Sequence, residues 1–233
     1  MSDSHRYAWM KGFVEIIRSP HELGMKGNPE PLKTLVLAGI LETSATLFIG
    51  WLHRTSPILI AENIAMMQPW MKKAGKTAVH SIGEFNFNQA FVSTLSSSFA
   101  SIFAFGAVLW IVHWMLTKQS RKLYEIAGMG AYASGVYALG TMITGLMQYL
   151  FGSLQWAPHL GVFMNPVEQP FLFAVLSRMN IVWILSYALA AYAIVGMSFV
   201  EKRYGQYAAA FITLIVVSWY GLFSAMGAYF SGK

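Results

Sequence analysis

Runs of residues without a single charge constrain the fold of this chain more than any other feature. Residues 179–199 are uncharged, and a second uncharged run, residues 204–232, begins directly after Glu201, Lys202 and Arg203. A hydrocarbon core about 30 Å thick is crossed by about 20 residues of α-helix, at about 1.5 Å per residue. Both runs reach that length, and the short segment between them has room only for a tight turn. The sequence therefore predicts a hairpin of two membrane-spanning helices.

Three more apolar runs precede this hairpin, and the composition agrees with them. Only 11% of the residues are charged, against about 25% in average soluble proteins. A soluble domain with so few charges would leave much of its surface apolar, so the composition excludes an ordinary soluble fold. We expect an all-α, polytopic membrane protein with five transmembrane helices and interfacial amphipathic helices. The expected spans are, in chain order, residues 32–52, 88–117, 124–151, 179–199 and 205–230.

Residues 1–30 contain two short helical signals ahead of the five-helix domain, which we assign to residues 31–232. Residues 7–18 place apolar side chains at helical spacing on one face, but a dozen residues cannot cross a bilayer. This segment is expected either to lie in the membrane interface on the cytoplasmic side or to pack beneath the bundle. Pro20 then marks the start of a second helix, with Ser19 as its N-cap and Glu22 completing a capping box.

The two longer loops are expected to differ in structure. Between the first two spans, residues 52–84 are too apolar for free solvent, and Pro57 and Pro69 bracket a helical stretch within them. We interpret this stretch as an amphipathic helix on the outer membrane surface or over the mouth of the bundle, with an ordinary packed loop as the alternative. Residues 155–169, which include prolines, are expected to be irregular and to face outward.

The distribution of basic residues predicts the orientation of the chain. With a cytoplasmic N-terminus, ten Lys and Arg residues fall on the cytoplasmic side and six on the outer side, in line with the excess of basic residues in cytoplasmic loops. The net charge of +6 is accordingly attributed to these loops and to lipid headgroups rather than to nucleic acid binding. We expect an integral membrane protein with its N-terminus in the cytoplasm and its C-terminus outside, in contact with membrane lipids and without a nucleic acid partner.

Glu42 lies near the middle of the first span. A carboxylate at the bilayer centre costs roughly 2.5–3.5 kcal/mol on insertion scales, so this residue should be protonated, paired or directed into a polar cavity. Thr43 and Thr46 are close to it in the sequence, and the serine-rich second span, including Ser97, can supply hydroxyl partners. Two interpretations stay open: a proton-linked or cation-binding site, or a protonated Glu that joins helices by hydrogen bonding.

Small residues recur at a spacing of four in the third and fifth spans. The pairs are Gly130 and Ser134, Ala131 and Gly135, and Gly221 and Ala225. This spacing lets helix backbones approach closely. The approach can occur inside the bundle or at an interface with a second copy or a foreign subunit, so these residues are candidates for a helix interface.

The sequence predicts no cofactor, no metal and no catalytic site. His53 and His113 fall at opposite ends of the first two spans, so they cannot face each other as two ligands of a haem. The histidines of the outer loops lack the local spacing of a zinc motif. The chain has no cysteine, and it shows no nucleotide-binding loop, nucleophile elbow or HExxH pattern. We therefore expect a protein without enzymatic activity.

The hairpin resembles the Yip family of Ypt/Rab-interacting membrane proteins, which has bacterial members. Its first half reads LSRMNIVWILSYALAAYAIVGMSF, including Asn180, Trp183 and Gly196, and its second half reads EKRYGQYAAAFITLIVVSWYGL. The N-terminal stretch FVEIIRSPHELGMKGNPEPLKTLVLAGI is also similar, with Pro20 before a short helix that leads into the first span. The resemblance covers nearly the whole chain. Because the acidic-Gly-Pro element of the eukaryotic members is missing, it implies a bacterial-type member.

This resemblance implies a function without a known reaction. We expect a non-enzymatic scaffolding, membrane-organising or partner-binding protein of the bacterial inner membrane. Its partners would be other membrane helices, in a homo-oligomer or a larger membrane complex. Two other hypotheses stay open: a small proton- or cation-linked transporter or channel that uses Glu42, and an accessory subunit of a larger membrane complex.

Overall fold

The computed structural model describes residues 8–73, 87–165, 168–176, 179–201, 203–215 and 218. Within these ranges the chain is helical, with one isolated antiparallel bridge between His159 and Asn180 and no strand. The helices are α2 (Ala8–Arg18), α3 (Pro20–Lys26), α4 (Pro31–Thr55), α5 (Pro57–Lys73), α6 (Phe87–Thr117), α7 (Leu123–Phe151), the 3-10 turn η2 (Leu160–Phe163), α8 (Pro170–Leu176) and α9 (Ile181–Met197). A further helix covers residues 203–215.

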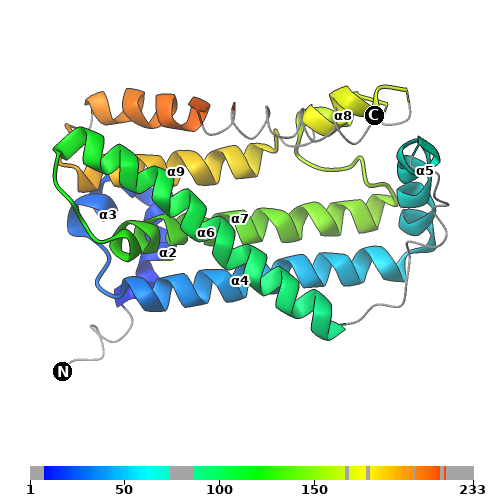
Figure 1. Ribbon diagram of the computed structural model, residues 1–233, viewed down its shortest axis with the longest axis horizontal. Coiled ribbons are helices and arrows are strands. Elements are labelled where there is room, and N and C mark those ends of the chain that lie inside the picture. Colours follow the sequence, from blue (N-terminus) through cyan, green and yellow to red (C-terminus); the bar gives the residue numbers. More distant parts are fainter. Residues whose placement is uncertain are drawn as a thin grey trace.

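Three of these helices, α4, α6 and α7, are long and apolar enough to cross a membrane. They coincide with the first three expected spans, so those predictions are confirmed at the level of helix length and composition. Successive long helices alternate in direction, and α6 crosses in front of α4 and α7 (Figure 1). The chain is therefore a membrane protein built on an antiparallel helical bundle.

The fourth expected span, residues 179–199, is shorter in the structure. Helix α9 has 17 residues and extends about 26 Å, a little less than a hydrocarbon core. It begins after Asn180, whose side chain accepts a hydrogen bond from the backbone N–H of Val182 at 2.9 Å and so caps the helix. It ends at Met197 because Phe199 adopts a φ of 57°, which α-helix cannot accommodate. Of the fifth span, residues 205–230, most lies outside the described residues.

Helix α7 forms the centre of the bundle and contacts α2, α4, α6 and α9. Its glycines lie where these neighbours approach most closely: Gly128 faces Pro31, Gly140 faces Val182 and Gly145 faces Ile49. A Cβ atom at any of the three would collide with the facing residue. Small side chains therefore position the helices by allowing their backbones to meet, as in other membrane bundles.

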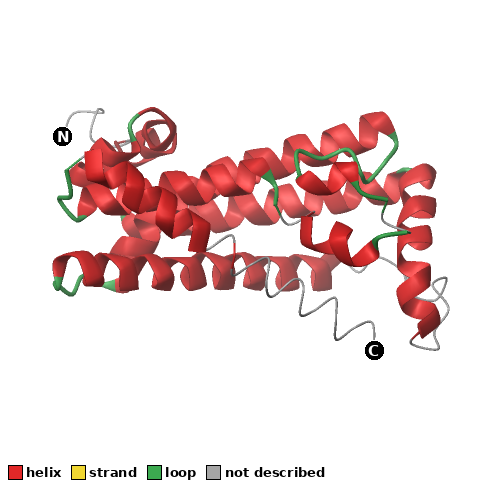
Figure 2. Cartoon of the chain, turned by 90° about the horizontal axis from the view of Figure 1, so that it is seen from above, coloured by secondary structure: helices red, strands yellow, loops and turns green. Residues whose placement is uncertain are grey.

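The short helices α2 and α5 lie across opposite ends of the bundle, as both views show (Figures 1 and 2). Helix α2 packs onto α7, with Ile16 fully buried and the Phe13 and Tyr132 rings edge to face at 5.1 Å. Helix α5 confirms the helical stretch expected after Pro57, whose tail was expected to carry Lys72, Lys73 and Lys76; it continues through Pro69 to Lys73, and Lys76 lies outside the described residues.

The predicted capping box at Ser19 is wrong, although α3 does begin at Pro20. The Ser19 side chain makes no capping hydrogen bond. Its backbone N–H instead donates to the Glu15 carbonyl at 2.8 Å, and its carbonyl accepts from the Leu23 N–H at 2.9 Å. These bonds continue the helical pattern of α2 into α3 through the backbone of Ser19.

Candidate intramembrane polar site

Glu42 lies at the middle of α4, between α6 and α7, and only 7% of its surface is exposed. Its carboxyl group has two hydroxyl partners, Ser134 of α7 and Ser101 of α6. The two ion pairs found in the described part of the chain, Lys26 with Glu15 and Lys33 with Glu30, lie elsewhere. The carboxyl group is thus held by hydroxyls of two neighbouring helices and not by a basic side chain.

The other residues expected beside Glu42 separate into two groups. Thr43 is buried, donates to the Gly39 carbonyl at 2.7 Å and contacts the Ser98 hydroxyl at 3.4 Å. Thr46 and Ser97 instead lie on the exposed surface of the bundle. The structure therefore replaces Ser97 with Ser98, which is buried beside Thr43, and with Ser101, which reaches Glu42 from the exposed edge of α6. Five serines within nine residues leave the rotation of this helix undetermined by sequence.

The outer surface of α6 carries a strip of exposed hydroxyls beside this site. We call Ser93, Ser97 and Ser101 the α6 serine strip: they are spaced by four residues, and all three are exposed. Helix α6 is the least buried of the three long spans. Thr46 of α4, one helical turn beyond Glu42, is also exposed. Through Ser101 the strip meets the buried carboxyl group of Glu42.

The small residues of α7 that were candidates for a helix interface contact other helices of the same chain. Gly130 lies against the Leu109 side chain and Gly135 against Phe13. Ala131 is fully buried in a cluster with Leu35, Ala38 and Ile102. Ser134 faces Glu42. The corresponding pair in the fifth span, Gly221 and Ala225, lies outside the described residues.

Three histidines of the described residues make side-chain hydrogen bonds at the two ends of the bundle. His53 Nε2 lies 2.9 Å from Gln148 Oε1 at the α5 end. His113 Nδ1 lies 2.8 Å from the Ser198 hydroxyl at the opposite end, where His21 Nε2 lies 2.8 Å from the Val200 carbonyl. Within the described ranges, no group of three or more His, Asp or Glu side chains could hold a metal ion.

Glu62 attaches α5 to the end of α7. One carboxylate oxygen accepts from the Ser153 hydroxyl at 2.8 Å, and the other from the Leu154 backbone N–H at 2.6 Å. Gln148 of α7 completes this arrangement by donating to the Leu154 carbonyl at 2.8 Å. The sequence analysis missed this contact. The only signal was a single carboxylate on the first half of α5, where Asn63 is the other polar residue.

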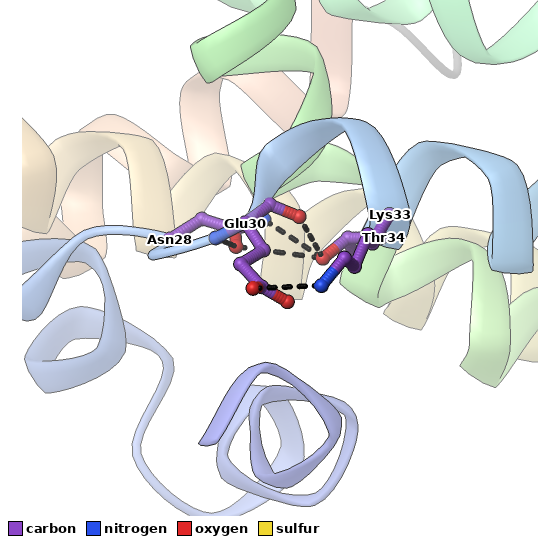
Figure 3. A network of polar contacts seen from close by, with 4 residues as sticks. All are labelled: Asn28, Glu30, Lys33 and Thr34. Carbon is purple, nitrogen blue, oxygen red and sulfur yellow. Dashed lines mark hydrogen bonds and ion pairs between the residues drawn. The ribbon is translucent and has the colours of Figure 1, made fainter. Parts of the chain in front are cut away.

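A second polar network joins the linker between α3 and α4 to α7. Asn28 donates to the Gly128 carbonyl at 2.9 Å and accepts from the Tyr132 hydroxyl at 3.0 Å. The side-chain oxygen Oδ1 of Asn28 also accepts from the Glu30 N–H at 3.0 Å, and its amide nitrogen donates to the Thr34 hydroxyl at 3.1 Å (Figure 3). Glu30 in turn pairs with Lys33. The network closes the linker against the bundle, although Glu30 Oε2 is buried without a hydrogen-bond partner.

Comparison of the chain with protein-family models, with curated proteins and with solved structures finds no match. The function therefore has to be argued from the geometry of the chain itself.

Proposed function

We propose that this chain is a non-enzymatic, Yip-like protein of the bacterial inner membrane that binds other membrane helices through the α6 serine strip. The observation that carries the proposal is the exposure of Ser93, Ser97 and Ser101 on the least buried of the long spans. Hydroxyls at membrane depth gain hydrogen bonds when a second helix covers them, and residues as small as serine let that helix approach closely.

The sequence suggested the small residues of α7 as an interface with another helix. In this proposal the α6 serine strip forms that interface instead. The small residues of α7 contact α2, α4 and α6 of the same chain and leave no room for another helix. Helix α6 has the same spacing of four on its open side. A second copy of this chain is the simplest partner for this side of α6, and a subunit of a larger membrane complex is the alternative partner.

The proposal includes five crossings, with the N-terminus in the cytoplasm and the C-terminus outside. Helix α9 and residues 203–215 continue the alternation of direction seen in α4, α6 and α7 (Figure 1). Among the described residues, the end of the bundle that carries α2 and α3 has eight Lys and Arg against five Glu, whereas the α5 end has three against two. The more basic end is assigned to the cytoplasm.

Cysteine cross-linking tests the serine strip, because the natural chain contains no cysteine. Ser97→Cys should form a cross-linked dimer, or a cross-linked complex with another subunit, in native membranes. Ile143→Cys, on an exposed apolar position of α7, is the matched control and should give no defined product. Equal cross-linking at both positions would contradict the proposal.

Replacement of the strip tests the same proposal by affinity. Interhelical hydrogen bonds in membranes contribute about 0.6–2 kcal/mol each, so the loss of two in Ser93→Leu combined with Ser97→Leu should weaken association about 8- to 800-fold. Neither side chain contacts Glu42, so the fold should be retained. A parent protein that is monomeric in mild detergent and in native membranes would refute the proposal.

A second candidate function is a proton-linked transporter centred on Glu42, and the hydrogen bonding of the site favours it specifically. The Ser101 hydroxyl donates to the Ser98 carbonyl at 3.0 Å, so its oxygen remains free to accept. A protonated Glu42 can donate to Ser101 and accept from Ser134. Glu42→Gln would keep both bonds but could not titrate. Proton flux into liposomes that is lost in this variant would support transport, and an absence of flux with the parent protein would exclude it.

A further inference from the structure

Helix α2 has two apolar sides, and only one of them is used by the bundle. Phe13 and Ile16 pack onto α7 and its surroundings. Met10, Val14 and Ile17 are 46%, 51% and 55% exposed on the other side. Their spacing of four and three residues places them on one stripe of the helix. An apolar stripe this open, on a helix already attached to the bundle, needs a further partner.

The depth of α2 places this stripe at the edge of the hydrocarbon. Helix α7 has 29 residues, about 43 Å, which exceeds a core of about 30 Å by roughly 13 Å. Helix α2 crosses α7 at Tyr132 and Gly135, about 14–18 Å from the start of α7 at Leu123. With the excess length of α7 extending on this side of the membrane, the hydrocarbon begins about 13 Å from Leu123, close to this crossing. Helices that lie in the plane of the membrane bury their apolar sides at this boundary between headgroups and acyl chains.

The residues around the stripe carry net positive charge and therefore complement a negatively charged surface. Lys11 and Arg18 are exposed on α2 itself. Glu15, the acidic residue of the same helix, is 3.8 Å from Lys26 of α3, so its charge is largely balanced. The whole end of the bundle that carries α2 has eight basic and five acidic residues among those described, so its net charge is also positive. Basic residues beside a membrane are attracted to anionic headgroups.

We propose that α2 binds the anionic phospholipids of the adjacent leaflet. Met10, Val14 and Ile17 enter the boundary of the acyl chains, and Lys11 and Arg18 contact lipid phosphates. The α2 surface is separate from the α6 serine strip, so this inference holds whether or not α6 binds a second helix. A soluble protein covering the stripe is the competing occupant, and the experiment distinguishes the two.

The test uses a fluorescent NBD label on a single cysteine in the full-length protein, reconstituted in vesicles. Val14→Cys and Ile17→Cys report on the stripe, and Glu22→Cys, at an exposed charged position of α3, is the control. In vesicles of phosphatidylglycerol and phosphatidylcholine, the stripe labels should emit at shorter wavelength and be quenched by doxyl-labelled lipid. The control label should be quenched by aqueous acrylamide.

The basic residues should determine the lipid dependence. Each contributes about fivefold to membrane attraction, so Lys11→Gln combined with Arg18→Gln should lower the ratio of lipid-quenched to acrylamide-quenched label about 25-fold in phosphatidylglycerol vesicles. Stripe labels open to acrylamide would overturn the proposal. Labels shielded from both quenchers would overturn it too, because they would show a protein covering the stripe. Equal quenching in pure phosphatidylcholine and in phosphatidylglycerol would refute the anionic preference.

Discussion

Asn28 links the N-terminal helices to the bundle, and its replacement by alanine should show how strongly. The side chain donates to the Gly128 carbonyl at 2.9 Å and to the Thr34 hydroxyl at 3.1 Å. It accepts from the Tyr132 hydroxyl and the Glu30 N–H, both at 3.0 Å. Each of these bonds contributes about 1 kcal/mol, so Asn28→Ala should lower the free energy of unfolding by about 4 kcal/mol.

A double-mutant cycle isolates one of these bonds. Tyr132→Phe removes only the hydroxyl that reaches Asn28, so it should cost about 1 kcal/mol. Both single variants lose this bond. The double variant should accordingly lose about 4 kcal/mol instead of the sum of about 5, which corresponds to a coupling energy of about 1 kcal/mol.

Unfolding in mixed detergent micelles, followed by circular dichroism at 222 nm, measures these free energies. Lys33→Gln is the control within the same network: its ion pair with Glu30 joins two side chains that are 63% and 38% exposed, and exposed pairs contribute less than about 1 kcal/mol. Additive losses in the Asn28 and Tyr132 variants would refute the reasoning, as would a Lys33→Gln loss equal to that of Asn28→Ala.

Two further predictions concern the α5 end of the bundle and the loop that contains His159. Glu62→Ala should free α5 from α7 and cost about 3–6 kcal/mol, since it removes two hydrogen bonds to a charged group at about 1.5–3 kcal/mol each. Hydrogen exchange should speed up at the Leu154 amide, and an unchanged rate there would contradict this. Burial lowers the pKa of His159 from its ordinary value of 6.5, and a backbone hydrogen bond opposes this in part. The folded state therefore binds this proton less readily than the unfolded state, so stability should be constant above about pH 6.5 and fall as the pH is lowered through that value. His159→Asn should flatten this dependence, and an unchanged pH profile would show that other groups cause it.

The sequence predicted the long spans well because bilayer thickness fixes their length. Uncharged or nearly uncharged runs of about 20 residues or more led directly to α4, α6 and α7. The ends of α9 escaped prediction for a local reason. The Asn180 cap and the left-handed backbone at Phe199 shorten the helix inside an unbroken apolar run, and hydropathy contains no information about either.

The partners of Glu42 escaped prediction because they depend on how the helices are rotated. The sequence showed that a buried carboxyl group needs hydroxyl partners, and it offered serines on every side of α6. Packing against α7 turns Ser98 inward, leaves Ser97 exposed and brings in Ser134, which the sequence had suggested only for close helix packing. A residue spacing of four thus indicates that a helix can be approached closely, but not from which side or by which neighbour. On α7 that neighbour is another part of the same chain, whereas on α6 the side with the same spacing is open to the membrane.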